Sequence, residues 1–415
     1  MKRCAAILAA GIAVAIIAAC GGSPATKSSA TKTSGVKTSE IKRGTLIPGI
    51  EPKVSTYLRT WPLGSDEAEL EKKIRWSAEQ IHGEYLEEII IAFAHIDQDD
   101  KSTIIFPDAP DDGSWDLWAE TAKLKMIWPH LKQHVSVGGW GAEFSDTAHD
   151  PDARAKFIAN LCGYLEQYDL DGADIDWEYP VGPDWGQEIT SRPEDKDNYI
   201  ALLTELRAAM DALGEKTGKR YGLSACIPAS AWWITKNDAI VAADIVDNLK
   251  LMAYDYYGGW SGTTGHLANL YNNPADPEWG GWSTDQAVNL YLNAGFPPEK
   301  ITLGLAFYGK AWKGVEDGGA NGLFQKYTES AYPDGLAWPQ IKEFINGGEY
   351  VRYWDDMAHA PFLYNGDIFI TYTDEEAIRE IAAYAKEKGL GGVMVWEYGH
   401  DMDGDLFKVL NESIQ

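Results

Sequence analysis

The feature that most constrains this chain is an alternation, between residues 51 and 415, of short apolar runs with longer helical patterns. Such runs, bounded by turn residues, indicate buried strands, and their alternation with helices is typical of a parallel sheet with crossover connections. Eight strands are predicted, near residues 53–58, 88–94, 134–138, 172–177, 221–227, 249–254, 301–307 and 392–396. Eight strand–helix repeats predict an α/β fold, a closed (β/α)8 TIM barrel, although a doubly wound open sheet would give the same local pattern.

One connection breaks this rhythm. Residues 310–371 are rich in Gly, Trp, Tyr and Asp, and they form a stretch far longer than an ordinary strand-to-helix loop. We interpret it as a small α+β insertion after the seventh strand. Because the active sites of barrels are built at the C-terminal ends of the strands, this insertion is expected to wall one side of the site.

The N-terminal fifty residues differ from the rest in composition. Lys2 and Arg3 precede an apolar run over 5–19 that ends at Cys20, which resembles the cleavage site of bacterial lipoproteins. Residues 1–19 are therefore predicted to be a lipoprotein signal peptide, Cys20 the lipidated residue, 20–50 a flexible Ser/Thr/Lys-rich tether, and 51–415 the catalytic domain. The alternative is an ordinary signal peptide with Cys20 incidental. The expected location is the cell envelope, through a lipid anchor in the outer membrane, or outside the cell.

Charge and motifs exclude several classes of partner. The net charge of −27 argues against nucleic acid, because phosphate binding needs clustered Lys and Arg. Neither a dinucleotide fingerprint nor a phosphate loop is present, so no cofactor is expected. Asp401, Asp403 and Asp405 mimic part of a calcium loop, but Leu406 stands where such a loop needs Gly, so we predict helix capping and no metal. Cys162 and Cys226 are expected to be buried free thiols.

The chemistry concentrates on the fourth predicted strand. Alternate residues of a strand share a face, so Asp174, Asp176 and Glu178 point one way while Ile175 and Trp177 point the other. In a barrel the shared face is the interior. Three carboxyls spaced about 6 to 7 Å apart in a poorly hydrated interior cannot all ionise cheaply, so at least one proton should be retained and shared.

A retained proton is what a general acid needs. Glu178 is nearest the C-terminal rim, and an ionised neighbour would raise its pKa so that it can protonate a leaving oxygen near neutrality. Asp174, the deepest, would hold or donate the proton that Asp176 exchanges. The alternatives are an acidic surface loop and a metal site. The strict alternation opposes the first, and the lack of clustered His partners opposes the second.

Five segments, in order, resemble the signature motifs of family 18 glycoside hydrolases, and together they cover essentially the whole domain. They are Ser136-Val-Gly-Gly-Trp140, Asp171-Gly-Ala-Asp-Ile-Asp-Trp-Glu178, Met252-Ala-Tyr254-Asp255, Gly304-Leu-Ala-Phe-Tyr308-Gly309 and Gly391-Gly-Val-Met-Val-Trp396. The resemblance implies substrate-assisted retention, in which the N-acetyl group of the substrate attacks the anomeric carbon while Glu178 acts as acid and then base. It further implies that Asp176 orients that group and that Tyr254 donates a hydrogen bond to the acetamido oxygen.

The same resemblance implies a set of sugar contacts. Trp396 resembles the tryptophan beneath the distorted sugar, Trp140 resembles an aromatic on the leaving-group side, and the remaining pocket positions are Tyr57, Phe93, Met252 and Asp255. The alternative for each aromatic residue is plain barrel core. For Phe93 that alternative weighs nearly as much as a sugar contact.

These features favour a chitinase that cleaves β-1,4-linked N-acetylglucosamine chains, so the expected partner is chitin or a chitooligosaccharide. One alternative is an endo-β-N-acetylglucosaminidase acting on N-linked glycans, which would share the barrel and the mechanism. Another is a non-catalytic chitin-binding lectin, but that reading normally requires loss of the acid, and Glu178, Asp176 and Tyr254 are all present.

Overall fold

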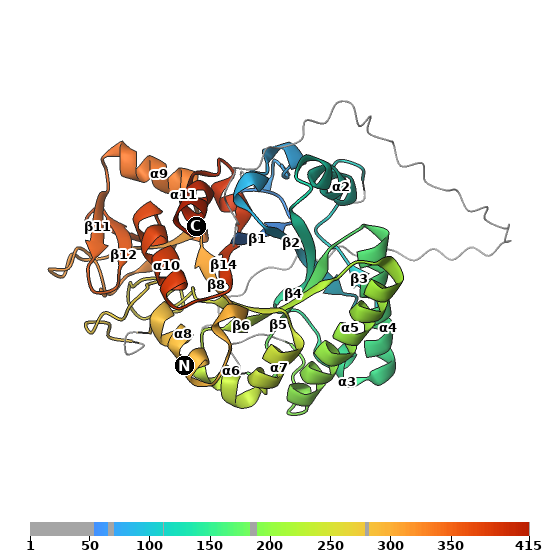
Figure 1. The fold of residues 1–415 in the computed structure, drawn as a ribbon. Helices are drawn as coiled ribbons and strands as arrows, with labels where there is room; N and C mark the ends of the chain where they lie inside the picture. The colour runs from blue at the N-terminus through green and yellow to red at the C-terminus, as the bar shows by residue number, and fades with distance from the viewer. Residues whose placement is uncertain (1–53, 65–69, 111, 183–188, 279–281, 415) are drawn as a thin grey trace, which may run out of the picture. The chain divides into compact units, whose positions relative to one another are not determined.

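The computed structural model describes residues 54–64, 70–110, 112–182, 189–278 and 282–414 (Figure 1). The predicted signal peptide, the tether and Cys20 lie outside these residues. Among the described helices, none has the length and apolar character that crossing a bilayer requires.

Eight parallel strands form a closed barrel, as predicted. They follow one another around the ring in the order β1, β14, β8, β7, β6, β5, β4 and β2, and pairing between β1 and β2 closes it. Every neighbouring pair in the ring is parallel. The strands are β1 (Val54–Arg59), β2 (Glu88–Ile96), β4 (Lys132–Trp140), β5 (Gly172–Glu178), β6 (Gly222–Pro228), β7 (Asn248–Met252), β8 (Ile301–Ala306) and β14 (Gly392–Trp396).

The predicted and observed strand bounds differ by at most two residues at either end, and the difference at the end of β7 bears on the site. The strand ends at Met252, two residues before the predicted end, because the backbone N–H of Ala253 donates to the carbonyl of Leu251 and the chain turns out of the ladder. Asp255 then adopts a φ of 60°. Tyr254 and Asp255 therefore lie on the loop above the strand.

Helices surround the barrel (Figure 1). Four of them begin at a side-chain cap, Asp116, Asp150, Ser283 or Asp374, whose oxygen accepts from the first free backbone N–H groups. The helices are α2 (Leu117–Ile127), α3 (Ser145–His149), α4 (Pro151–Gln167), α5 (Asp195–Thr217), α6 (Ala231–Lys236), α7 (Ala239–Ile245), α8 (Thr284–Asn293), α10 (Glu375–Glu387) and α11 (Asp405–Ile414).

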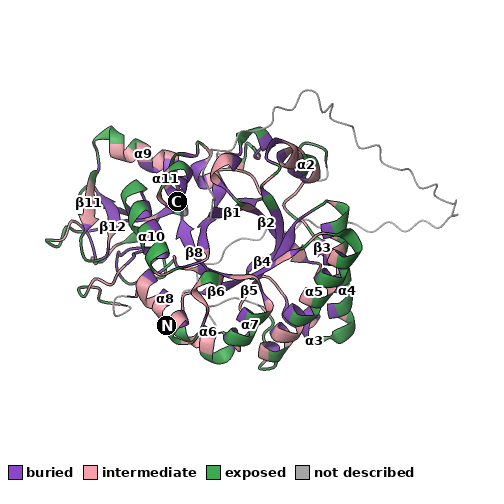
Figure 2. Ribbon diagram, viewed as in Figure 1, coloured by how far each residue is buried: buried purple, intermediate pink, exposed green. Residues whose placement is uncertain are grey.

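The barrel strands are buried on both faces, whereas the surrounding helices carry exposed residues (Figure 2). On β5, Ile175 and Trp177 are buried against the outer helices, and the Trp177 ring stacks on Phe144 at 5.3 Å and meets Tyr199 of α5 edge-on at 6.0 Å. The opposite face of β5 is therefore left to the barrel interior.

A five-stranded antiparallel sheet lies between β8 and β14, which confirms the predicted insertion after the seventh barrel strand. Its strand order is β10-β9-β13-β12-β11. The elements are β9 (Tyr308–Lys313), β10 (Glu329–Ala337), α9 (Trp338–Gly347), β11 (Val351–Asp355), β12 (Ala360–Tyr364) and β13 (Ile368–Thr371), drawn in orange in Figure 1.

Two further sequence predictions concern Asp401 and the two cysteines of the domain. Asp401 accepts from the backbone N–H groups of Leu406 and Phe407 at the start of α11, as expected of a capping residue. Cys162 and Cys226 are both free thiols, but only Cys226 is buried. Cys162 is partly exposed because the face of α4 that packs on the barrel is formed by other residues, among them Leu161 and Leu165.

Candidate active site

The acid ladder, by which we mean Asp174, Asp176 and Glu178, occupies the inner face of β5. Asp174, Asp176 and Glu178 lie opposite Ser136, Gly138 and Trp140 of β4 in the parallel register. Residue 138 must be a glycine, because a Cβ placed there would lie 1.9 Å from the backbone oxygen of Asp176. The two strands can approach this closely only without a side chain at that position.

Asp174 is the deepest member, and it is fully buried. Its Oδ2 accepts from the Tyr57 hydroxyl at 2.9 Å and the Ser136 hydroxyl at 2.8 Å, while its Oδ1 accepts from the Ser224 hydroxyl at 2.5 Å. The Cys226 thiol adds a longer contact of 3.6 Å. These donors come from β1, β4 and β6, so Asp174 ties three other strands to β5 through its two oxygens.

Asp176 is only 4% exposed, and its Oδ1 is buried without a hydrogen-bond partner. Burial raises the pKa of Asp176 well above its usual value, and the negative charges of Glu178 and then Asp174 raise it further. A carboxyl in this setting holds a proton far more readily than one in water.

Glu178 is the last residue of β5 and is partly buried. Burial raises its pKa to about 7, the charge of Asp255 adds to the rise, and a hydrogen bond with Tyr179 opposes it. The sequence interpretation attributed the rise to an ionised neighbour. Burial is the larger cause, and the charge that contributes is that of Asp255 on the loop after β7.

That loop supplies the next group of predicted residues. Tyr254 is partly buried, and burial raises the pKa of its hydroxyl well above the usual value, to which the charges of Asp176 and Glu178 add. A Cβ at residue 304 would lie 2.9 Å from the Tyr254 ring, so Gly304 leaves the space that the ring occupies. Met252, at the end of β7, packs against the same buried cluster as Tyr254.

Two side chains of the insertion bind Asp255. Its Oδ1 accepts from the Tyr308 hydroxyl at 2.6 Å and lies 2.7 Å from the ammonium of Lys310. That ammonium also lies 4.2 Å from the ring centroid of Trp260, which is 62% exposed. The insertion therefore reaches the site through β9, as the sequence predicted for a wall of the site.

Aromatic rings gather at the ends of β1, β2 and β14. The Trp396 ring lies 5.3 Å from Tyr57 and 5.5 Å from Phe93, and Trp61 stacks on Phe93 at 6.3 Å. Phe93 is only 9% exposed between these rings, which favours the reading of Phe93 as core. Trp140, at the end of β4, is 61% exposed and lies level with Glu178.

Sequence reasoning missed several of these residues. Ser224 and Cys226 alternate along the fifth predicted strand, so the period of two could have placed both with the inward acids. Lys310 follows the seventh strand at the same spacing from Tyr308. Trp61 carries no strand signal, since it lies on the loop after β1.

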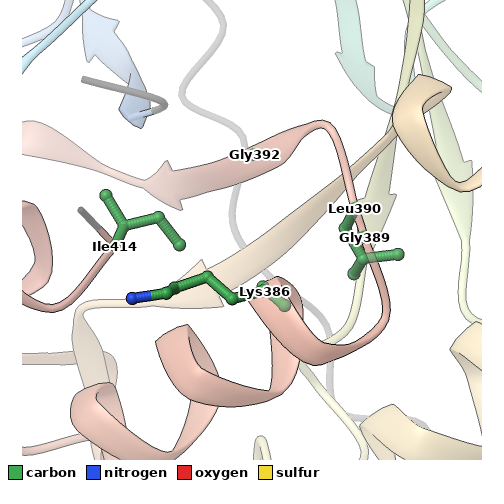
Figure 3. Close-up of a pocket in the computed structure, with 6 residues that line it drawn as sticks. Lys386, Gly389, Leu390, Gly392 and Ile414 are labelled. Carbon is green, nitrogen blue, oxygen red and sulfur yellow. The ribbon is translucent and has the colours of Figure 1, made fainter. Parts of the chain in front are cut away.

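A separate small cavity lies at the other end of β14 (Figure 3). It measures about 150 Å³ and is lined by Ala385, Lys386, Gly389, Leu390, Gly392 and Ile414. Because these residues surround the start of β14, whereas Glu178 ends β5, this cavity belongs to the opposite end of the barrel and plays no part in the site above.

Comparison with known proteins adds a family to this geometry. The sequence model of glycosyl hydrolases family 18 matches residues 65–401. Chitinase A1 of Niallia circulans is 37% identical over 312 residues, which cover 71% of this chain and 43% of that protein. The chain spans about half the length of the curated relatives it matches.

Two solved structures resemble the fold. A glycoside hydrolase family 18 N-acetylglucosaminidase from Paenibacillus barengoltzii shares 34% identity with a TM-score of 0.73, covering 87% of this chain and 99% of the other. A multi-modular chitinase expressed on the cell surface of a Paenibacillus species shares 32% identity with a TM-score of 0.75, covering 87% of this chain and 42% of the other.

Proposed function

The chain belongs to family 18 of the glycosyl hydrolases, and on that premise we propose that it hydrolyses β-1,4-linked N-acetylglucosamine chains with Glu178 as the proton donor. One observation carries this proposal. The outermost carboxyl of a buried acid ladder has a pKa of about 7, so it keeps a proton to donate close to neutral pH. A general acid works best when its pKa lies near the working pH.

The proposed reaction is substrate-assisted and retaining. The N-acetyl oxygen of the bound sugar attacks the anomeric carbon, Glu178 protonates the departing glycosidic oxygen, and a cyclic oxazolinium ion results. Glu178, now ionised, then takes a proton from the water that opens this ring. The raised pKa of Asp176 supports this scheme, because a carboxyl that holds its proton is a poor nucleophile.

The other acids and Tyr254 would orient the acetamido group. Asp176 lies between Asp174 and Glu178 on one face of β5, so turning its free oxygen toward the rim would bring it to the acetamido N–H and the positive oxazolinium. Tyr254, kept protonated by burial, would donate to the acetamido oxygen. Asp174 would hold the deep end of the ladder through its donors from β1, β4 and β6.

The proposed sugar contacts are inferred from the exposure and packing of the aromatic side chains. Trp396 and Tyr57 would offer apolar surface beneath the distorted sugar, with Phe93 supporting Trp396 from behind. Trp140, exposed and level with Glu178, would stack on a sugar of the leaving group. Met252 and Asp255 would complete the wall from the loop that follows β7.

Short oligomers are a second candidate substrate. The family 18 relative from Paenibacillus barengoltzii is named an N-acetylglucosaminidase, and it matches this chain over 99% of its own length. That match favours an enzyme that trims single sugars from chain ends as an alternative to one that cuts a polymer internally. The two activities share the chemistry at Glu178 and differ in product size.

The test is a time course on chitooligosaccharides and on a high-mannose glycoprotein, with wild type, Glu178→Gln and the matched surface variant Glu215→Gln on the exposed side of α5. We expect cleavage of the oligosaccharides, loss of about 10²- to 10⁴-fold in Glu178→Gln, and full activity in Glu215→Gln. Cleavage of the glycoprotein alone would overturn the substrate, and undiminished activity in Glu178→Gln would overturn the acid. Binding without cleavage by wild type would identify a lectin.

The envelope location remains part of the proposal. A lipid on Cys20 followed by a Ser/Thr/Lys-rich tether would keep the catalytic domain at the membrane surface, where a polymer can reach it. Metabolic labelling with palmitate should mark the wild-type chain and leave Cys20→Ala unlabelled. Equal labelling of both chains would contradict the anchor.

A further inference from the structure

A buried ion pair crosses the barrel below the acid ladder. The side chain of Lys250, on β7, is fully buried, and its ammonium lies 3.2 Å from Oε1 of Glu88 on β2 and 3.4 Å from Oδ1 of Asn248. In the closed ring, β2 and β7 are four strands apart in either direction, so the pair joins opposite sides of the barrel. Glu88 begins β2, which places the pair near the N-terminal end.

His134 of β4 completes this floor. Its Nδ1 lies 2.8 Å from the same Glu88 oxygen. Two glycines leave room for the ring, because a Cβ at Gly172 or Gly222 would lie 2.6 or 2.7 Å from it. The end of the barrel opposite Glu178 is therefore closed by ionisable side chains, at positions where apolar residues would be cheaper to bury.

Both partners of the pair are held in their charged forms. Burial opposes the charge of Lys250, yet the nearby charges of Glu88 and then Asp174 raise the pKa of its ammonium. Burial likewise opposes the charge of Glu88, yet Lys250 and then His134 lower its pKa well below the usual range. A buried ammonium kept charged in this way produces a strong local field, since little water screens it.

Cys226 connects Lys250 with the acid ladder. Lys250 is the register partner of Cys226 on β6, and the Cys226 sulfur lies 2.9 Å from the Tyr57 hydroxyl and 3.6 Å from Asp174. Asp174 in turn accepts from the hydroxyls of Tyr57, Ser136 and Ser224, so Cys226 connects Lys250 with the most buried of the three acids. Asp176 lacks such donors on its Oδ1.

We propose that Lys250, paired with Glu88 across the closed end of the barrel, is a positioning residue whose buried positive charge acts on the acids above it and so sets the pH range in which they exchange the catalytic proton. The inference rests on the proposed hydrolytic function and assigns a role to a residue that touches no substrate.

The ladder has other charged and titratable neighbours, and the test must separate Lys250 from them. At the rim Glu178 meets Asp255, which Lys310 neutralises in part from β9. The titratable and charged groups around the ladder are Tyr57 on β1, Glu88 on β2, His134 on β4, Tyr179 after β5, Tyr199 on α5, Cys226 on β6, Lys250 on β7, Tyr254 and Asp255 after β7, and Tyr308 and Lys310 on β9.

The test uses opposite changes of charge at the two ends of the pair. In Lys250→Met the loss of the positive charge makes every acid above it harder to ionise, so both limbs of the pH profile of kcat/KM on chitotetraose should move to higher pH, by about half a unit or more. In Glu88→Gln the loss of the negative charge should move both limbs to lower pH. The double variant removes both charges and should return the limbs toward their wild-type positions.

The controls separate electrostatics from damage to the fold. Lys132→Met removes an exposed ammonium at the same end of β4, where solvent screens it, and should leave both limbs in place. If Lys250→Met does not fold, Glu88→Gln should still move both limbs to lower pH, and the double variant should still return them toward their wild-type positions. Limbs that stay fixed in the folded variants, or that move the same way in both single variants, would overturn the inference.

A second measurement does not depend on turnover. The unfolding free energy is measured as a function of pH for Glu88→Gln and for the double variant, and the second curve is subtracted from the first. The difference reports how Lys250 affects proton binding by the buried acids, and it should change with pH between about pH 4 and 8. An inactive wild type with this pH dependence would contradict the proposed function alone. An active wild type without it would contradict the role of Lys250 alone.

Discussion

The Tyr57 hydroxyl donates a 2.9 Å hydrogen bond to Oδ2 of Asp174, which joins β1 to β5 inside the barrel. Tyr57 is 1% exposed, and its ring also meets Trp396 at 5.3 Å. One side chain thus contacts both the deep end of the acid ladder and the aromatic floor proposed for the sugar. The chemistry and the binding surface are therefore held in a common position by Tyr57.

Removing that hydroxyl should weaken catalysis. In Tyr57→Phe, Asp174 loses one hydrogen-bond donor worth about 0.5–1.5 kcal/mol, so kcat should fall by roughly three- to tenfold if the acids depend on the position of Asp174. Steady-state kinetics on chitotetraose checks this. Tyr384→Phe is the matched control, because the Tyr384 hydroxyl donates to Asp285 at the same 2.9 Å outside the barrel. Equal kinetic losses in both variants would contradict a special role for the Tyr57 bond.

Neutralising Asp176 should make the protein less active and more stable above neutral pH. Burial raises the pKa of Asp176, so its ionisation is costly in the folded chain, and Asp176→Asn removes that penalty while abolishing proton exchange. We expect kcat to fall by about 10²-fold or more and the melting temperature at pH 8 to rise. Thermal unfolding and turnover on the same samples check both.

Asp171→Asn is a control for which we expect the opposite change in melting temperature. Asp171 is also buried, but a hydrogen bond from the Gln133 backbone and the ammonium of Lys219 at 3.0 Å hold its pKa below the usual value despite burial. Its substitution should therefore lower the melting temperature at pH 8. A fall in both variants would mean that Asp176 is stabilised as an anion, against our reading.

Glu178 should make the stability depend on pH in a defined window. Below its usual pKa of 4.5 the carboxyl is protonated in the folded and unfolded chains alike, so its contribution to stability is fully present there. Between 4.5 and about 7 only the unfolded chain releases the proton, so this contribution is lost as the pH rises.

Glu178→Gln isolates that contribution. The unfolding free energy of Glu178→Gln minus that of wild type should increase across this window, by on the order of 2 kcal/mol after allowance for the partial exposure of Glu178, and then level off. Urea unfolding at a series of pH values measures it. A difference that is constant with pH would show that the pKa of Glu178 is not raised by folding.

Trp140 should matter for binding alone. Its ring is 61% exposed, so Trp140→Ala should change the unfolding free energy by no more than about 0.5 kcal/mol. If Trp140 stacks on a leaving-group sugar, KM for long oligomers should rise about three- to tenfold, with a smaller effect on short substrates. Met357, which is 55% exposed and lies between β11 and β12 of the insertion, serves as the control through Met357→Ala. An unchanged KM at every chain length would contradict the stacking role.

Local sequence pattern was enough for the strands of the barrel and for the acid ladder. Ile175 and Trp177 alternate with the three acids along β5, so the period of two separates the apolar outer face of this strand from its acidic inner face. The same period of two applies to Ser224 and Cys226 on β6, which bind Asp174. The insertion could be located from loop length alone, because a connection of that size requires its own core.

Contacts between distant segments could not be read in this way. The pairing of Lys250 with Glu88, 162 positions apart in sequence, depends on barrel closure, as do the support of Asp255 by Tyr308 and the stacking of Trp61 on Phe93. The cause of the raised pKa of Glu178 belongs to the same class, since burial depends on everything that surrounds a group. Strand periodicity is a local property of the backbone and is therefore written in the order of residues, whereas desolvation and through-space charge arise only when remote segments meet.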